Sequence, residues 1–321
     1  MTSVNETHIF DIYNIQSSLA ERFLMGFWCV LTTSISLSGN CLVLIASHKY
    51  DVIKLDKVST ILIKNIAVAD LGFALMIIFT LITIIQDTWI FGTFICEALN
   101  YINIFLGISE VNLICALNIS KLHCLLFPFQ ARLRSVRTGH LIAFSMWSIM
   151  PIFHFIPSIM LGRKVAFRLS YYRCEGYFEG AKAMFPMFSG VLFIILPLLT
   201  VLMVIIWLLY YVRGVRGLQK QRILILLLIS LCYFCSYLPF GIYHIVKATV
   251  PGLENNISIS IYFYRFAIFI IYLNFSANPI IYIFSVKSFK YFVANLCTNN
   301  LRRKHDFNRT AHLSRIKDFR I

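Results

Sequence analysis

Seven long apolar segments constrain the fold of this 321-residue chain more than any other feature of its sequence. They cover residues 23–47, 58–86, 96–126, 140–161, 184–212, 221–247 and 261–285. A helix of about 20 residues is long enough to cross the hydrocarbon core of a bilayer. The composition, 59% hydrophobic and only 13% charged residues, is also far from that of a soluble domain. The sequence therefore predicts an all-α membrane protein built as a seven-transmembrane helix bundle.

Positive charge is distributed unevenly between the loops on the two sides of these segments. The loops at 48–57, 127–139, 213–222 and 286–321 carry 19 Lys and Arg residues together, against eight on the other side. Basic loops remain in the cytoplasm, so we expect an extracellular N-terminus and a cytoplasmic C-terminus in the plasma membrane. The basic face suits anionic lipid or an acidic cytosolic partner, and its pattern does not resemble a nucleic-acid-binding surface.

The segments around the bundle divide the chain further. We expect an extracellular tail at 1–22, the seven-helix domain at 23–286, a membrane-surface helix at 287–297 and a disordered cytoplasmic tail at 298–321. The first residues lack a cleavable signal-peptide pattern, so the first span is expected to direct insertion. Aromatic and lysine residues mix in 287–297, which predicts a short amphipathic eighth helix with Cys297 as a candidate lipidation site.

Two cysteines lie on the predicted extracellular side. They are Cys96, at the outer end of the third span, and Cys174, in the longest outer loop. A disulfide between them is the simplest interpretation in an oxidising compartment, and two free thiols are the alternative. On the same side, Asn5 and Asn256 begin N-x-Ser/Thr sequences and are candidate glycosylation sites.

Polar side chains from four spans converge on one depth of the membrane. Helical rise places Asn40, Asp70, Glu110, Asn274 and Asn278 about 12–18 Å from the inner surface. Such groups must face the interior of the bundle and are usually functional. The two carboxyl groups could share a proton or bind a cation between them, whereas a protonated, hydrogen-bonded structural Glu110 is the alternative.

The order of several short motifs resembles the rhodopsin-like (class A) family of G-protein-coupled receptors. The matching features are Gly39-Asn40, Asp70 of AVAD, Cys96 with a loop Cys174, Trp147, Pro197, Tyr237 to Pro239, NPIIY at Asn278 to Tyr282, and Phe289. Each motif is weak by itself, but one of them falls in each expected span on the expected side. The resemblance covers residues 22–297 and implies a receptor that moves its helices when an extracellular ligand binds.

One departure from that family falls at the inner end of the third span. Alignment puts the family's Asp-Arg-Tyr triplet on Ser120, Lys121 and Leu122. Lysine keeps the charge but lacks the planar guanidinium, and Ser120 cannot act as the acidic partner. We therefore expect a weak inner lock, with raised basal activity, altered coupling or poor coupling. The alternative is that Lys121 only reaches for the lipid interface.

The resemblance also assigns roles to other residues. Transducer coupling falls to Ser120, Lys121, Leu122 and Tyr282, and the activation switch to Pro197, Tyr233, Tyr237, Pro239 and Pro279. Tyr237 stands where the family has its toggle tryptophan. The family's sodium pocket maps onto Asp70, Asn274 and Asn278, with Glu110 in place of a small serine, so sodium is the one candidate cofactor.

The same alignment suggests which residues line the ligand pocket. The candidates are Asn103, Gly107, Ser189, Phe240, His244, Ile268 and Tyr272. Asn103 occupies the position where amine receptors carry an aspartate, and Tyr272 occupies the retinal-lysine position, so neither a biogenic amine nor retinal is expected. Basic residues at the outer face could attract an anionic small molecule, a lipid or an acidic peptide, or could form a solvated surface.

The leading function is therefore a G-protein-coupled receptor with an extracellular ligand and with heterotrimeric G protein or arrestin as cytosolic partners. The first alternative is an ion channel or transporter that uses Asp70 and Glu110, although the chain shows no internal repeat. The second alternative is an atypical receptor that does not couple to G proteins. The sequence contains no H-E-x-x-H, G-x-S-x-G or phosphate-loop motif, so an enzyme is not expected.

Overall fold

The computed structural model describes residues 17–49, 56–168, 172–177, 195–214, 217–249 and 257–285. Its long helices are α2 (Leu19–Lys49), α3 (Lys57–Gln86), α4 (Gly92–Leu126), α6 (Val136–Met160), α8 (Leu196–Tyr211), α9 (Gly217–Thr249) and α10 (Ile257–Ser285). The shorter elements are α5 (Pro128–Leu133), β1 (Lys164–Arg168), β2 (Arg173–Tyr177) and the 3₁₀ turn η4 (Val212–Gly214). Seven of these segments are long and apolar enough to cross a membrane, which confirms the predicted multi-pass helical fold.

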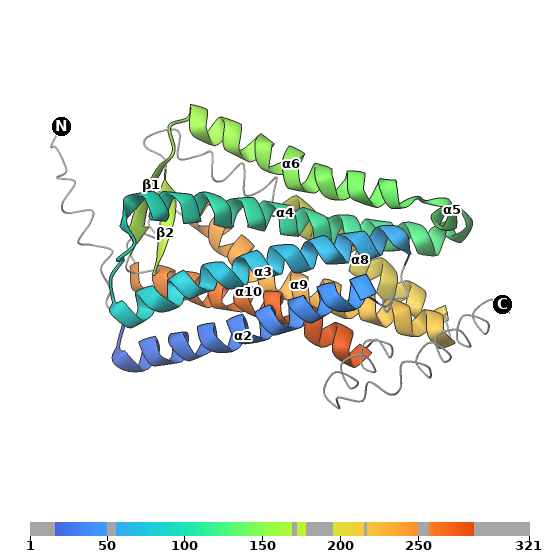
Figure 1. Cartoon of the computed structure of the whole chain (residues 1–321), viewed down its shortest axis with the longest axis horizontal. Coiled ribbons are helices and arrows are strands. Elements are labelled where there is room, and N and C mark those ends of the chain that lie inside the picture. Colours follow the sequence, from blue (N-terminus) through green and yellow to red (C-terminus); the bar gives the residue numbers. More distant parts are fainter. Residues whose placement is uncertain are drawn as a thin grey trace.

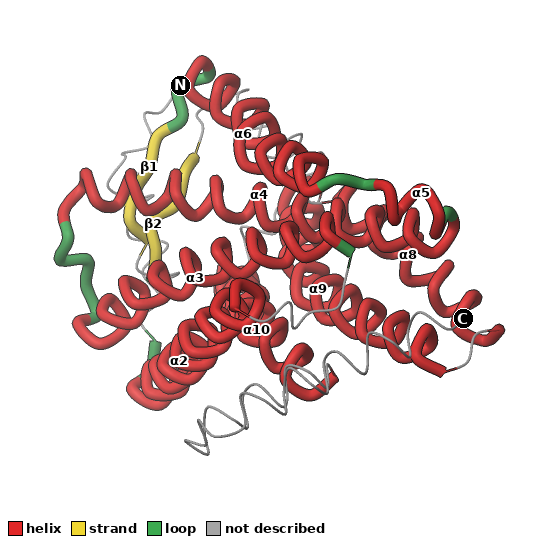
Figure 2. Tube along the Cα trace, turned by 45° about the vertical axis from the view of Figure 1, so that its right-hand side comes forward, coloured by secondary structure: helices red, strands yellow, loops and turns green. Residues whose placement is uncertain are grey.

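The helices run side by side along the long axis of the molecule, with the β1–β2 hairpin at one end and α5 at the other (Figure 1). Helix α4 passes through the interior, where it contacts α3, α6, α8 and α9. Helix α6 lies at the periphery against α3 and α4, as a second view also shows (Figure 2). Residues of α4 therefore reach the surroundings of most other spans, from the hairpin to α5.

The ends of α3 show how the sequence sets helix boundaries. Asp56 precedes the helix with extended backbone angles, and its carboxylate accepts a hydrogen bond from the Ser59 amide at 3.0 Å. This satisfies one of the amides that a helix leaves unpaired in its first turn. At the other end, Asp87 terminates the helix in the left-handed conformation, with φ 53°.

A small residue allows α2 and α10 to approach closely. A Cβ added at Gly39 would lie 2.6 Å from both Cβ and Cγ of Pro279. Small residues at such crossings let membrane helices pack with their backbones near each other. Nearby, the rings of Phe73 and Phe275 stack with their centroids 4.2 Å apart, joining α3 to the same part of α10.

The longest predicted outer loop contains a short antiparallel hairpin. Strands β1 and β2 pair so that Phe167 lies opposite Cys174. The segment 184–194 of the predicted fifth span and the predicted eighth helix at 287–297 lie outside the described residues. So do Asn5, Ser189, Asn256, Phe289 and Cys297, and the predictions made for them stay predictions.

Candidate functional site: three polar clusters along the bundle

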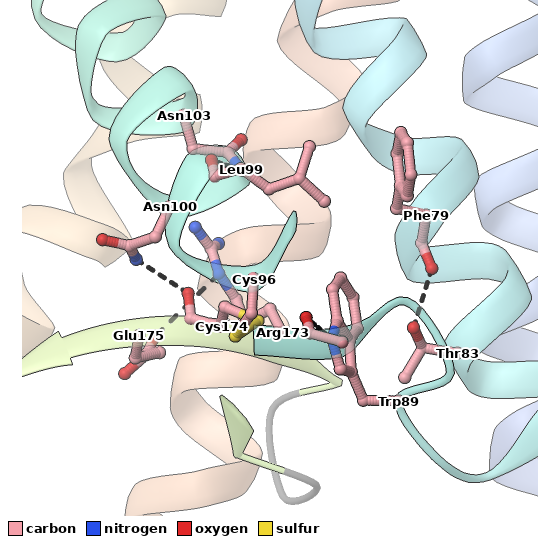
Figure 3. The surroundings of a disulfide bond; sticks show 11 residues. Phe79, Thr83, Trp89, Cys96, Leu99, Asn100, Asn103, Arg173, Cys174 and Glu175 are labelled. Atoms are coloured by element: carbon pink, nitrogen blue, oxygen red, sulfur yellow. Dashed lines mark hydrogen bonds and ion pairs between the residues drawn. A yellow bond between two sulfur atoms is a disulfide. The ribbon is translucent and has the colours of Figure 1, made fainter. Parts of the chain in front are cut away.

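A disulfide attaches the hairpin to the end of α4. Cys96 and Cys174 are bonded, with their Cα atoms 5.4 Å apart, which confirms the bridge and excludes the alternative of two free thiols. One turn along α4, Asn100 donates from its Nδ2 to the Cys174 carbonyl at 2.8 Å (Figure 3). Strand β2 is thereby held over one end of the bundle, with Arg173 and Glu175 on either side of the cysteine.

A pocket lies near this end, between α3, α10 and the segment before β2. It is lined by Thr80, Tyr172, Tyr264, Arg265, Ile268, Phe269 and Tyr272. Of the predicted ligand residues, the structure therefore brings Ile268 and Tyr272 together. Sequence reasoning missed the contribution of Tyr172, because a contact between a loop residue and α10 depends on the tertiary structure.

Three further predicted ligand residues with described side chains, Asn103, Gly107 and Phe240, are not among the residues that line that pocket. Asn103 is half-buried and donates from its amide to the Leu99 carbonyl of its own helix at 2.9 Å. A Cβ at Gly107 would only touch Phe73, at 3.8 Å. Phe240 lies close by, with its ring centroid 6.2 Å from that of Tyr264. The side chain of His244 is outside the described part of the molecule.

Cationic and aromatic side chains alternate around the pocket. The guanidinium of Arg265, only 6% exposed, lies over the rings of Tyr172 and Tyr262 at 5.4 and 5.8 Å. The Tyr264 hydroxyl bonds to the Glu175 carboxylate, which also lies 3.9 Å from Arg173 Nε. Burial raises the pKa of the Tyr172 phenol, so this residue remains a neutral hydrogen-bond donor.

The predicted mid-membrane polar cluster is present in the middle of the bundle. Glu110 accepts hydrogen bonds from the Tyr237 hydroxyl at 2.7 Å and from Asn274 Nδ2 at 2.8 Å. Asn278 Nδ2 donates to Asp70 Oδ2 at 3.2 Å. Both carboxyl side chains are 0% exposed, and they lie within hydrogen-bonding reach of each other.

The fifth predicted member of this cluster is a structural neighbour. Asn40 donates to the Ser36 side chain and to the Phe275 carbonyl at 3.2 and 3.0 Å, and Ser36 donates to the Asp70 carbonyl at 3.3 Å. Asn40 thus connects α2 to α10 beside Asp70 without touching the carboxylate. Its role is to satisfy backbone groups where α2 and α10 meet.

The cluster has the chemistry of a small cation site. Among the described residues, no hydrogen bond reaches Asp70 Oδ1, Asn274 Oδ1 or the hydroxyl oxygens of Ser109 and Tyr233, although all four atoms are buried. Oxygen ligands of this kind suit a hard cation such as sodium, and two carboxylates supply the compensating charge. The residues present therefore fit the predicted ion, which Asp70, Glu110 and Asn274 would hold, whereas the fourth predicted residue, Asn278, donates to Asp70.

A third cluster lies at the opposite end of the bundle, around Lys121, which the family resemblance aligns with the Asp-Arg-Tyr triplet. Lys121 Nζ lies 2.9 Å from Asp56 Oδ2, and Arg134 Nη2 lies 3.4 Å from Asp56 Oδ1. Burial opposes ionisation of this carboxyl group, but the Lys121 charge and hydrogen bonds from Lys121 and Ser59 outweigh it and hold the Asp56 pKa well below its ordinary value.

This arrangement gives Lys121 an ionic partner, while the expected weak inner lock stays a prediction. Ser120 is not an ionic partner, as expected, but Asp56 of another helix takes that role for Lys121. The Lys121 side chain is only 14% exposed and points to a carboxylate, which disfavours the alternative of a lysine that reaches for the lipid interface. An acid directly before a helix, followed three residues later by Ser59, is an N-cap signal, but its cross-helix partner is not visible in a sequence.

Of the predicted switch residues, Tyr237 belongs to the mid-membrane cluster through its hydrogen bond to Glu110. Tyr233 and Tyr237 are buried on successive turns of α9, with ring centroids 4.8 Å apart. Pro197 lies in the first turn of α8, and Pro239 and Pro279 lie inside the continuous helices α9 and α10. Leu122 packs against the hydrophobic core. Tyr282 belongs to α10, but its side chain is outside the described residues.

Comparison with known proteins agrees with this architecture. Residues 39–282 match the family described as 7 transmembrane receptor (rhodopsin family), whose members are receptors and not enzymes. Among curated proteins, the chain is similar to C-C chemokine receptor type 3 of Cavia porcellus, with 25% identity over 167 residues. That match covers 51% of this chain and 42% of the relative, so the chain spans less than half the relative's length. Because the family match extends from the first span to the last, the chain belongs to the rhodopsin family of seven-transmembrane receptors.

Proposed function

We propose that this protein is a plasma-membrane receptor that carries the signal of an extracellular ligand to a heterotrimeric G protein or arrestin. One observation supports this most directly, namely the hydrogen bond between Tyr237 and Glu110 in the middle of the bundle. It connects α9, the helix with the proline-containing switch segment, to α4, which reaches both the disulfide end and the Lys121 end. A ligand that favours one arrangement of α9 would therefore change the surroundings of α4 along its length.

We further propose that the hairpin end is extracellular. The disulfide at that end needs an oxidising compartment, and the basic loops predicted from the sequence lie at the other end. Under this orientation the α5 end, with Lys121 and Ser120, faces the cytosol and forms part of the transducer-binding surface together with Leu122 and Tyr282.

An acidic peptide or small protein is the ligand class that we propose for the outer pocket. The basic and aromatic lining, with Arg265 over Tyr172, suits a carboxylate flanked by apolar groups. The relative found in the comparison is, by its name, a receptor for a C-C chemokine, which points to a protein ligand of similar kind. Neither Asn103 nor Tyr272 supplies the group that an amine or retinal requires.

The proposed cation site would act as a modulator of this receptor. When bound, a sodium ion would offset the charges of Asp70 and Glu110 and so favour the arrangement in which the two carboxylates are close together. A proton shared by the same two groups would have a similar effect. We expect sodium to stabilise the wild-type protein against thermal unfolding more than it stabilises Asp70→Asn, which lacks one of the two carboxylates.

A test of the ligand proposal uses arrestin recruitment and G-protein dissociation in cells that express the receptor. A panel of chemokine-type proteins and acidic peptides is applied to the wild type and to Arg265→Gln. We expect at least one to activate the wild type and to lose about tenfold or more in potency on Arg265→Gln, since a charge-assisted contact contributes about 1.5–3 kcal/mol.

The matched control for that test is Arg22→Gln. Arg22 is also near the outer end but is not among the residues that line the pocket. It bonds to the Ile84 carbonyl and to Asp87, whose carboxylate also accepts from the Tyr172 hydroxyl at 3.4 Å. Equal loss of potency in both variants would contradict a specific role for Arg265. A ligand-independent ionic current through purified protein in planar bilayers, absent from Glu110→Leu, would favour the channel or transporter alternative instead.

A further inference from the structure

A single carboxylate joins three parts of the chain at the end of the bundle that carries Lys121. Asp56 precedes α3, Lys121 belongs to α4, and Arg134 follows the short helix α5. The two cations reach different oxygens of the same carboxyl group, at 2.9 Å for Lys121 and 3.4 Å for Arg134. One acidic side chain therefore holds both the charged residue of the altered triplet and the loop that follows it.

The position of this carboxylate is determined by its own helix. Asp56 Oδ1 accepts from the Ser59 amide at 3.0 Å, and Asp56 Oδ2 accepts from the Ser59 hydroxyl at 2.7 Å. An N-cap side chain cannot move away without leaving the first turn of the helix unsatisfied. Asp56 is thus a fixed acceptor, and a motion that removes Lys121 or Arg134 from it must break the ion pairs.

Both ion pairs are sheltered from water. The side chains of Asp56, Lys121 and Arg134 are 20%, 14% and 17% exposed. Coulomb attraction is stronger and less screened in such partly buried sites than at an open surface. These contacts consequently have more weight than the average surface salt bridge.

Arg134 also forms hydrogen bonds with α4, the helix that carries Lys121. Its guanidinium donates to the Ser120 hydroxyl at 3.1 Å, to the Ser120 carbonyl at 3.4 Å and to Cys124 Sγ at 2.6 Å. Arg134 therefore connects the segment after α5 to Ser120 and Cys124 of α4, and through Asp56 to the start of α3. Ser120, which stands where the family has its acid, here serves as an acceptor for arginine.

We propose that Asp56 is the inhibitory lock of this receptor, and that it restrains Lys121 and Arg134 together in the absence of ligand. The proposal rests on the proposed receptor function and names a regulation of its inner surface. In this receptor the restraining acid is Asp56 at the start of α3, and not the residue next to Lys121. Activation then requires that α4 and the α5 loop separate from α3, which frees two cations for an acidic surface of the transducer.

The decisive variant is Asp56→Asn. Asparagine is as good an N-cap as aspartate, so the start of α3 is preserved while the charge that binds both cations is removed. We expect ligand-independent G-protein dissociation or arrestin recruitment, corrected for surface expression, to rise by about tenfold, which corresponds to about 1.4 kcal/mol. Arg134→Gln removes only one ion pair, and we expect a smaller rise of about threefold.

The matched control is Asp87→Asn. It makes the same chemical change at the opposite end of the same helix, where Asp87 pairs with Arg22 at 3.2 Å. Asparagine also tolerates the left-handed backbone of that residue. We expect no change in basal signalling, so an equal rise in this control would overturn the assignment of the lock to Asp56.

A second measurement separates the lock from the coupling proposal. Hydrogen exchange of the purified, ligand-free receptor in nanodiscs reports the opening of α5 without any transducer. We expect amides of α5 to exchange about tenfold faster in Asp56→Asn than in the wild type. Faster exchange with no signalling by any variant, wild type included, would leave the lock standing and refute the coupling proposal.

The opposite result refutes the lock. If Asp56→Asn and Arg134→Gln reach the cell surface, and the wild type responds to its transducer, unchanged basal signalling in both variants overturns the proposal. Unchanged exchange of α5 in both purified variants overturns it independently. If Asp56→Asn does not fold, basal signalling and hydrogen exchange of α5 are measured on Arg134→Gln instead.

Discussion

Removing the Tyr237 hydroxyl group should show how much its hydrogen bond to Glu110, which joins α9 to α4, contributes to stability. The Tyr237 hydroxyl donates to Glu110 Oε2 at 2.7 Å, and both side chains are buried. Tyr237→Phe leaves the ring in place but deprives a buried carboxyl group of one donor. A buried acceptor that loses its partner costs about 1–3 kcal/mol, so we expect a decrease of that size in the free energy of unfolding.

Tyr233→Phe provides the matched control for this prediction. Tyr233 is one turn away on the same helix and equally buried, and its hydroxyl has no hydrogen-bond partner among the described residues. Losing this hydroxyl removes no bond among the described residues and removes a buried polar group without a partner, so we expect Tyr233→Phe not to lower the free energy of unfolding.

The assay is a double-mutant cycle with Tyr237→Phe, Glu110→Met and the combination of both. Unfolding is followed in mixed micelles titrated with a denaturing detergent, by near-ultraviolet circular dichroism. The bond between Glu110 and Asn274 is absent from both Glu110→Met proteins and cancels from the cycle. We expect an interaction energy of about 1–2 kcal/mol, and a value below about 0.5 kcal/mol would refute the reasoning, because independent sites add within that margin.

Three further predictions test other contacts. Gly39→Ala should lower the stability of the purified receptor by about 1–3 kcal/mol, because the new methyl group would lie 2.6 Å from Pro279, and an unchanged thermal melt would contradict the close crossing of α2 and α10. Cys96→Ser removes a disulfide between cysteines 78 positions apart and should lower the free energy of unfolding by up to about 4 kcal/mol, measured as a loss of thermal stability. Reducing the wild type should cause the same loss, and the substitution should have no further effect when both proteins are reduced. Because the pKa of Asp56 is depressed, its ion pairs are present above the ordinary carboxyl pKa of 3.8 and are lost only as the pH falls below that value. Ligand-independent transducer activation in inside-out membranes should therefore not rise between about pH 8 and pH 5. A rise near about pH 6 would show that another group controls the lock.

Those features of the receptor that depend on local sequence or on depth in the membrane were predictable. Span positions follow from the length of apolar runs, since each helix satisfies its own backbone hydrogen bonds in lipid. The convergence of Asp70 and Glu110 followed from helical rise, and the structure shows both in one buried cluster. The disulfide followed from the sidedness of Cys96 and Cys174.

Contacts between helices depended on the tertiary structure. Helical rise gives the depth of a side chain, but its direction in the bundle depends on how each helix rotates and tilts against its neighbours. For this reason the sequence placed Tyr237 on the switch helix without revealing its bond to Glu110. The pocket likewise includes Tyr172, whose position beside residues of α10 follows from the tertiary structure.

The altered triplet shows this division most clearly. By itself, the sequence places a lysine without a preceding acid at the positions that the family resemblance aligns with the Asp-Arg-Tyr triplet. The structure shows that Asp56 is the N-cap of α3. Only the packing of α3 against α4 decided that this cap also binds Lys121, because residues 65 positions apart meet through the crossing of two helices. Local sequence specifies what each group can donate or accept, and tertiary structure selects its partner.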